Sequence, residues 1–149
     1  MKEIVTFLSF DGNCRQAMEF YQECLGADLF LLPFSEAPVE LPWVPADAKD
    51  RIMHATLTNG PSTLLMASDI LPGTPFHPGN SAVMIHCESL TELERLFTAL
   101  GVNGKVTMAL QDTFWGARFG TLTDQFGISW MFNFAHPTQG ARKPPILDA

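Results

Sequence analysis

Two histidines are the residues best suited to acid–base chemistry in this 149-residue sequence. His54 stands between Met53 and Ala55 in a stretch with strand character, and His86 stands near the end of another apolar run. An imidazole can act as a general base or donate a hydrogen bond to the carbonyl group of a ligand. It can also be purely structural, with its ring bound to a backbone carbonyl. His54 and His86 are therefore the candidate catalytic residues, and the sequence leaves both roles open.

The remaining histidines and the cysteines form no recognisable catalytic or metal-binding motif. His77 and His136 adjoin prolines, and no two histidines have the H-x-x-x-H spacing of a metal pair. Cys14 and Cys24 lie on one predicted helix, so their Cα atoms are roughly 15 Å apart. A disulfide needs a separation below about 7 Å. These two cysteines and Cys87 are predicted to be buried, reduced thiols.

Phe114, Trp115 and Arg118 offer contacts to a ligand without catalysis. The two aromatic rings either stack on a flat ligand or pack to close one end of the fold. Arg118 either pairs with an anionic ligand or is solvated. The sequence does not decide between these alternatives.

The overall composition excludes several classes of protein. The net charge is −7 and no Lys/Arg cluster is present, so a nucleic-acid or anionic-membrane surface is not expected. With 46% hydrophobic residues the chain can bury a substantial core. No apolar run approaches the roughly 18 residues of a membrane-spanning helix. The N-terminus begins without a signal-peptide pattern, so a cytoplasmic location is expected.

The order of predicted elements repeats once along the chain. A strand over 4–10 precedes a helix with Asn13 as its N-cap, which ends at Gly26. A second helix begins after Ser89 and ends at Gly101. The last two strands are joined by a turn over 124–127. The other predicted strands cover 29–34, 52–58, 62–68, 82–87 and 106–110, and the hairpin strands lie within 115–122 and 128–134.

This repeat predicts an α+β fold of two βαβββ modules, whose curved mixed sheets surround a cup. We expect one domain over 1–149, with modules at about 4–68 and 80–134, a linker over 69–79 and a mobile tail over 137–149. A long loop over 35–50, around Trp43, is of the kind that covers a site or an interface.

Six short motifs resemble the PhnB-like branch of the vicinal-oxygen-chelate superfamily, which includes glyoxalase I, bleomycin-resistance proteins and extradiol dioxygenases. The resemblance covers roughly residues 4 to 134. The motifs are Phe10-Asp11-Gly12-Asn13-Cys14, Phe20-Tyr21, Met53-His54-Ala55, Met66-Ala67-Ser68-Asp69, Phe114-Trp115 and the stretch from Asp124 to Met131.

The resemblance implies where metal-dependent members of the superfamily would hold their ion. Its four ligand positions, on the first, fourth, fifth and eighth strands, fall near Thr6, Met66, Ala82 and Met131. None of these is an imidazole, carboxylate or thiolate, the donors that divalent first-row metals need. No metal and no cofactor are therefore expected.

The same register predicts which side chains line the cup. Its mixture of thioether, aliphatic, hydroxyl and amide groups suits a small, partly apolar molecule. The predicted ligand-binding residues are Thr6, Leu8, Met66, Ser68, Phe114, Trp115, Met131 and Asn133.

Three functions are compatible with these features. The first is a metal-free, homodimeric protein that binds a small organic molecule. The second is a glyoxalase-like isomerase or lyase, or a dioxygenase-type enzyme, that uses His54, His86 or a displaced metal. The third is a protein–protein contact made by the loop around Trp43.

Overall fold

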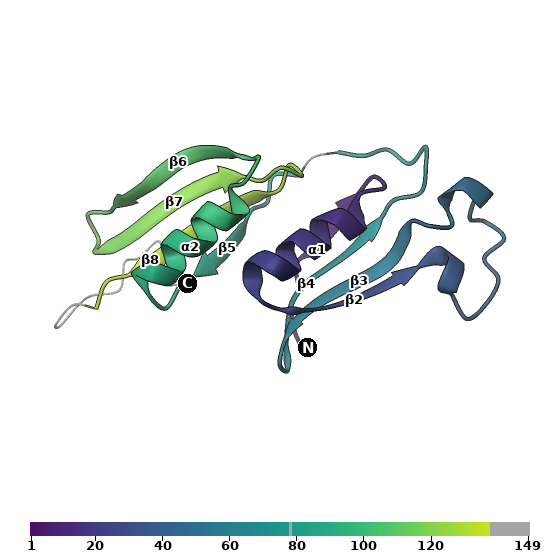
Figure 1. The fold of residues 1–149 in the computed structure, drawn as a ribbon, viewed down its shortest axis with the longest axis horizontal. Helices are drawn as coiled ribbons and strands as arrows, with labels where there is room; N and C mark the ends of the chain where they lie inside the picture. The colour runs from purple at the N-terminus through teal and green to yellow at the C-terminus, as the bar shows by residue number, and fades with distance from the viewer. Residues whose placement is uncertain (78, 138–149) are drawn as a thin grey trace. The chain divides into compact units, whose positions relative to one another are not determined.

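A computed structural model describes residues 1–77 and 79–137 of the chain. The chain divides into two compact units, residues 1–78 and 79–149. Each unit contains one four-stranded mixed sheet and one α-helix, which lies against a single face of its sheet (Figure 1). The predicted α+β fold with two βαβββ modules is therefore confirmed. The predicted tail falls largely on 138–149, outside the described residues.

The first unit pairs its first strand with its last. β1 and β4 are parallel, and β3 is antiparallel to both β4 and β2, which gives the order β1-β4-β3-β2. The elements are β1 (Phe7–Phe10), α1 (Cys14–Leu25), β2 (Asp28–Pro33), the 3-10 helices η1 (Phe34–Glu36) and η2 (Ala46–Ala48), β3 (Ile52–Asn59) and β4 (Ser62–Asp69).

The second unit repeats this topology in the order β5-β8-β7-β6. β5 and β8 are parallel, and the other two pairs are antiparallel. Its elements are β5 (Val83–His86), α2 (Leu90–Leu100), β6 (Lys105–Asp112), β7 (Ala117–Thr123) and β8 (Ser129–Ala135).

Each helix buries an apolar stripe against its sheet, as 3.6-residue spacing requires. In α1 the buried side chains include Ala17, Met18 and Tyr21. In the second unit, Phe97 of α2 makes an edge-to-face contact with Phe132 of β8, with ring centroids 5.2 Å apart. Trp130, two residues earlier on β8, is 1% exposed. The unit cores therefore lie between helix and sheet.

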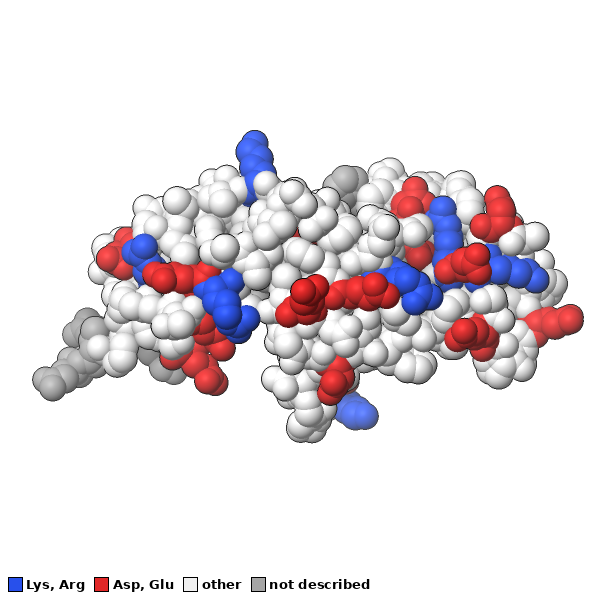
Figure 2. All heavy atoms as spheres, in the orientation of Figure 1, with Lys and Arg blue, Asp and Glu red and all other residues white. Residues whose placement is uncertain are grey.

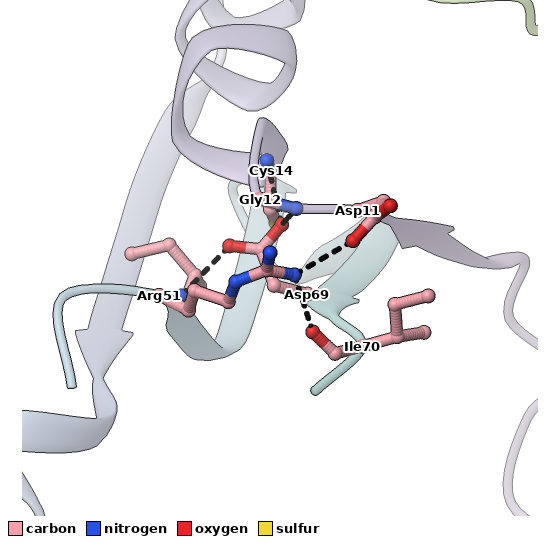
Figure 3. A network of polar contacts seen from close by, with 7 residues as sticks. Asp11, Gly12, Cys14, Arg51, Asp69 and Ile70 are labelled. Carbon is pink, nitrogen blue, oxygen red and sulfur yellow. Dashed lines mark hydrogen bonds and ion pairs between the residues drawn. The ribbon is translucent and has the colours of Figure 1, made fainter. Parts of the chain in front are cut away.

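The two helices begin in different ways. Ser89 caps α2 as predicted, because its Oγ accepts a hydrogen bond from Glu92 N at 3.0 Å. Asn13 occupies the N-cap position of α1 but makes no side-chain cap bond, so its predicted capping role is wrong. The carboxylate of Asp69 accepts bonds from Gly12 N and Cys14 N instead, each at 2.9 Å (Figure 3).

Asp69 also joins the start of β3 to this helix terminus. Its Oδ2 accepts a hydrogen bond from Ile52 N at 2.8 Å. Arg51 lies beside it, donating to Asp11 at 2.8 Å and to the carbonyl of Ile70 at 2.7 Å (Figure 3). β4 itself ends at Asp69, one residue beyond its predicted end.

The predicted turn between β7 and β8 is confirmed. Gly127 has φ of 87°, and Asp124 Oδ1 accepts from Phe126 N at 2.8 Å. Asp124 Oδ2 also accepts from the indole Nε1 of Trp130 at 2.8 Å, which fixes that side chain in the core. β7 itself begins at Ala117, so Trp115 belongs to the β6–β7 loop and not to the strand.

The surface carries charges of both signs. On the face shown in Figure 2, basic side chains lie next to acidic ones. No helix within residues 1–77 or 79–137 has both the length and the apolar character needed to span a membrane.

Candidate functional site on the helix-free sheet faces

Each sheet has one face that its helix does not cover. On β4, Leu65, Ala67 and Asp69 are buried on the helix side, whereas Met66 and Ser68 alternate with them and are partly exposed. On β8, Trp130 and Phe132 are buried on the helix side. We call the opposite surfaces the open faces of the first and second sheets.

Strand pairing places two rows of side chains on the open face of the first sheet, because paired residues point to the same side. Phe7 and Phe30 are 54% and 57% exposed, so this face presents accessible aromatic surface. The first row is Phe7, Met66, Thr56 and Phe30, and the second is Ser9, Ser68, His54 and Leu32.

The structure corrects the predicted orientation of β1. Leu8 pairs with the buried Ala67 and is 9% exposed, so it points toward the helix and not onto the open face. Thr6 precedes the strand and shares the alternation of Leu8. A one-residue change of register reverses every side chain of a strand. The segment offers apolar residues at both parities, so its pattern could not fix the register.

His54 makes one defined contact on the open face of the first sheet. Its Nε2 lies 2.8 Å from Thr56 Oγ1, two residues along β3. This hydrogen bond is to a side chain, and not to the backbone carbonyl of the structural alternative. Thr56 was absent from the predicted site, although its two-residue spacing from His54 on one strand was a usable signal.

The open face of the second sheet matches the predicted orientation of β8. Met131 and Asn133 lie opposite Trp130 and Phe132, on the side to which the register of the resemblance assigned them. Met84 and His86 of β5 lie beside Met131 and Asn133, respectively. The first row is Met84, Met131, Thr121 and Met108. The second row is His86, Asn133, Phe119 and Gln111.

His86 and Asn133 form a polar pair on this face. Asn133 Nδ2 lies 3.3 Å from His86 Nδ1. Asn133 is 3% exposed, and its Oδ1 is buried without a hydrogen-bond partner in the described part of the chain. Unpaired buried acceptors are uncommon in folded proteins, so this amide marks a site of interest.

The two aromatic residues of the β6–β7 loop have different environments. Phe114 is 95% exposed, while Trp115 is partly buried. Their rings contact edge to face at a centroid distance of 4.7 Å. The indole Nε1 of Trp115 is buried and finds no acceptor among the described residues. Trp115 is therefore partly packed into the loop, while Phe114 contacts its ring and keeps most of its own surface exposed.

Arg118 is engaged by an acidic neighbour. Its guanidinium lies 3.3 Å from Asp112 Oδ1, and His136 Nε2 lies 3.5 Å from the same oxygen. The hydrogen bond from Arg118, and then that from His136, lowers the pKa of the Asp112 carboxyl below its usual value. Arg118 is therefore neither an isolated anion-binding group nor a fully solvated one.

The loop after β2 encloses an open groove of about 510 Å³. It is lined by residues between 34 and 44 together with Lys49. Trp43 is 59% exposed and contacts the ring of Phe34 edge to face at 6.1 Å. Ala48 and Val44 are buried, so the loop is packed against its own short helices.

The residues on the relevant strands do not fit the metal site of the superfamily. Of the four positions that the resemblance implies, Met66 and Met131 lie on the open faces, where their paired neighbours are Phe7 and Met84, respectively. Phenyl and thioether groups are poor ligands for divalent first-row metals. Within residues 1–77 and 79–137, no group of three or more His, Cys, Asp or Glu side chains could hold a metal ion.

Cys14, Cys24 and Cys87 are buried and form no disulfide among the described residues, as predicted. Burial, and then the nearby Asp69 charge, raises the pKa of the Cys14 thiol to about 12, partly offset by Arg15. Burial, and then Glu92, raises the pKa of Cys87 to about 11, with Arg95 opposing. Neither thiol is a competent nucleophile near neutral pH.

Comparison with known proteins identifies a matching family, similar sequences and similar structures. Residues 3–132 match the Glyoxalase/Bleomycin resistance protein/Dioxygenase superfamily. Protein YjdN of Escherichia coli K12 is 35% identical over 143 residues, covering 89% of this chain and 97% of YjdN. Protein PA1353 from Pseudomonas aeruginosa has 42% identity and a TM-score of 0.80, over 92% of this chain and 100% of that structure.

A PhnB protein from Bacillus cereus has 26% identity and a TM-score of 0.69, covering 90% of this chain and 100% of that structure. This likeness agrees with the six motifs that indicated the PhnB-like branch. The match over residues 3–132 spans both modules of the fold. The chain therefore belongs to the glyoxalase/bleomycin resistance protein/dioxygenase superfamily and is similar to its PhnB-like members.

Proposed function

We propose that this protein binds a small organic molecule on the open faces of its sheets, without a metal ion. The observation that carries this proposal is the composition of the second open face. There the polar pair of His86 and Asn133 lies beside the thioethers of Met84 and Met131. A few polar groups set among polarisable apolar side chains are typical of small-molecule sites.

The first open face supports the same proposal. Met66, Ser68 and His54 lie there with the exposed ring of Phe30 beside them. These residues combine thioether, hydroxyl and imidazole groups, and Asp28, paired with Thr58, lies further along the same face. Membership of a superfamily that includes resistance proteins is compatible with binding in the absence of chemistry.

A thermal-shift screen of small carboxylic acids, ketones, amides and antibiotics tests the proposal. Hits should raise the melting temperature of the wild-type protein, because a ligand that binds only the folded state stabilises it. The shift should shrink in Met131→Asp, which places a charge on the second open face. Glu94→Gln, on the exposed side of α2, is the matched surface control. Hits unaffected by Met131→Asp would locate binding elsewhere.

A second candidate is an isomerase or lyase that uses His54. Its support is the 2.8 Å contact between His54 Nε2 and Thr56 Oγ1, which orients the ring on an open face. Turnover of any identified carbonyl substrate should then be lost in His54→Ala and reduced in Thr56→Val. A fully active His54→Ala variant would eliminate this candidate.

We also propose a homodimer in the cytoplasm. β6 is an edge strand whose residues are almost all exposed, including Val106 and Met108 at 50% and 42%. Such an edge favours association unless it is covered. The free cysteines agree with a reducing compartment. Light scattering should give twice the chain mass of 16.5 kDa, and a monomer at micromolar concentration would contradict the dimer.

A further inference from the structure

The pairing of Asn133 with His86 determines which ring nitrogen carries the proton. Asn133 Nδ2 is a donor, so the His86 Nδ1 that it contacts at 3.3 Å must be the acceptor. A neutral imidazole with an unprotonated Nδ1 carries its hydrogen on Nε2. His86 is exposed, and Nε2 has no partner within the described residues. The free nitrogen is therefore a hydrogen-bond donor.

The opposite orientation of the amide is less favourable. Asn133 is almost wholly buried, so whichever amide atom turns away from His86 is left unpaired. In the observed orientation this atom is the Oδ1 acceptor. Among the described residues, a flipped amide would leave both N–H donors of Nδ2 without partners, whereas the observed orientation leaves one N–H and the oxygen unpaired. Buried donors without partners are rarer in proteins than under-satisfied carbonyl oxygens, which favours the observed arrangement.

We infer that Asn133 is a positioning residue that holds His86 as an Nε2–H donor, so that the second open face receives a carbonyl or carboxylate group of the ligand. This inference rests on the proposed binding function and gives it a ligand class. It also assigns His86 a role that differs from general-base catalysis. A base needs an unprotonated nitrogen facing the substrate, and the free nitrogen of His86 carries the proton.

The residues around the His86–Asn133 pair are compatible with a ligand that carries a hydrogen-bond acceptor. The two rows of this open face contain no acidic residue that would repel a carboxylate. Met84 and Met131 lie next to the pair and provide apolar contact. The ligand expected here joins an acceptor group to a short apolar chain.

A spectroscopic experiment tests the positioning role without any ligand. Nitrogen-15 chemical shifts of the His86 ring should show the Nε2–H tautomer at about pH 9, where imidazoles are neutral. In Asn133→Asp, a carboxylate oxygen would accept from Nδ1–H, so the tautomer should reverse. Asn133→Leu should give a mixture of both tautomers. An Nδ1–H tautomer in the wild type would overturn the inference.

Probe binding tests the ligand class separately. The probes are 4-methylpentanoate and 4-methylpentan-2-one, with 4-methylpentylamine as a matched molecule that lacks a carbonyl. The two carbonyl probes should shift the His86 ring and Met131 methyl resonances of the full chain, and the amine should not. His86→Gln, which keeps an N–H donor, should retain binding, while His86→Leu should weaken it at least tenfold.

The two measurements fail in distinguishable ways. Equal binding of the amine and the carboxylate, or indifference to His86→Leu, would overturn the acceptor-group ligand class. If none of the three probes shifts either resonance, the proposed binding function fails at this face. The tautomer measurement would still decide the role of Asn133, because it depends only on the folded protein.

Discussion

Asp69 connects three parts of the first unit through one carboxylate. Its two oxygens accept hydrogen bonds from Gly12 N, Cys14 N and Ile52 N, which belong to the start of α1 and the start of β3. Asp69 is 5% exposed, so these bonds replace hydration that the carboxylate loses on burial. The position of β4 relative to α1 therefore depends on this side chain.

Replacing Asp69 by Asn should destabilise the protein by about 2–3 kcal/mol. The amide keeps only one acceptor oxygen, and its NH₂ group would face a backbone donor, leaving buried groups unpaired. Urea unfolding measures the change. Asp11→Asn is the control, because the Asp11–Arg51 ion pair is largely exposed and such pairs contribute roughly 0–1 kcal/mol. Equal effects of the two substitutions on the free energy of unfolding would contradict the role of Asp69 in connecting α1, β3 and β4.

The buried thiol of Cys14 should make stability depend on pH in the alkaline range. Its pKa is raised from 9.0 to about 12 in the folded state, so above pH 9 only the unfolded chain readily loses the proton. This contribution to stability is complete below about pH 9 and is lost as pH rises toward 12. Unfolding at pH 8 and 10.5 should show a smaller decline in Cys14→Ala than in the wild type.

Identical declines in the two proteins would show that Cys14 ionises as easily in the fold as in the unfolded chain. Cys87 provides an independent comparison, since its pKa is raised to about 11 by burial and Glu92. Its contribution should be lost between about pH 9 and 11, over a narrower range than that of Cys14.

At the scale of elements, comparing the two helices shows how much an N-cap hydrogen bond contributes to stability. Ser89 Oγ accepts from Glu92 N, while Glu92 Oε1 accepts from Glu88 N at 3.0 Å, so the start of α2 is satisfied locally. Ser89→Ala should lower the free energy of unfolding by about 1 kcal/mol. Asn13→Ala should cost only a few tenths, because the Asn13 side chain makes no cap bond. Denaturant titration of both variants measures the difference, and a larger loss for Asn13→Ala would contradict the assignment.

The sequence was informative wherever local periodicity and turn chemistry act together. The helix stops at Gly26 and Gly101 and the turn over 124–127 were predicted and are confirmed. The orientation of β8 was also predicted, because its large apolar side chains fall at a single parity. These features depend on residues that are neighbours along the chain.

The missed features depend on contacts between distant segments. Asp69 caps α1 from 55 residues away, which no local pattern reveals. β1 is only four residues long and has apolar side chains at both parities, so its pairing with β4 decides that Leu8 is buried. The pairing of His86 with Asn133, 47 residues apart, likewise requires the parallel register of β5 and β8.

At the scale of the whole molecule, the same strand topology occurs in both units. Met66 and Met131 occupy the fourth and eighth strands, where a metal-dependent member needs imidazole or carboxylate donors. The two units thus share a topology, and each presents an open face of its own. Fold membership by itself therefore does not assign a reaction.

Metal analysis directly tests the proposal that the ligand binds without a metal ion. Protein purified without chelators, then incubated with nickel, zinc or manganese and desalted, should retain far less than one ion per chain. The open-face strands supply phenyl and thioether groups where the ion would need nitrogen or oxygen donors. Retention of about one ion per chain, removed by Met66→Ala or Met131→Ala, would show that these positions do coordinate a metal.

The most direct test of the central claim is a methyl spectrum of protein labelled with carbon-13 at its methionines. Met66, Met84 and Met131 lie on the open faces, whereas Met18 is a buried residue of α1 itself. A small organic ligand from the thermal-shift screen should move the resonances of at least one open-face methionine and leave that of Met18 unchanged. Movement of Met18 without the open-face methionines, or saturating binding with no methyl shift, would contradict the proposed site.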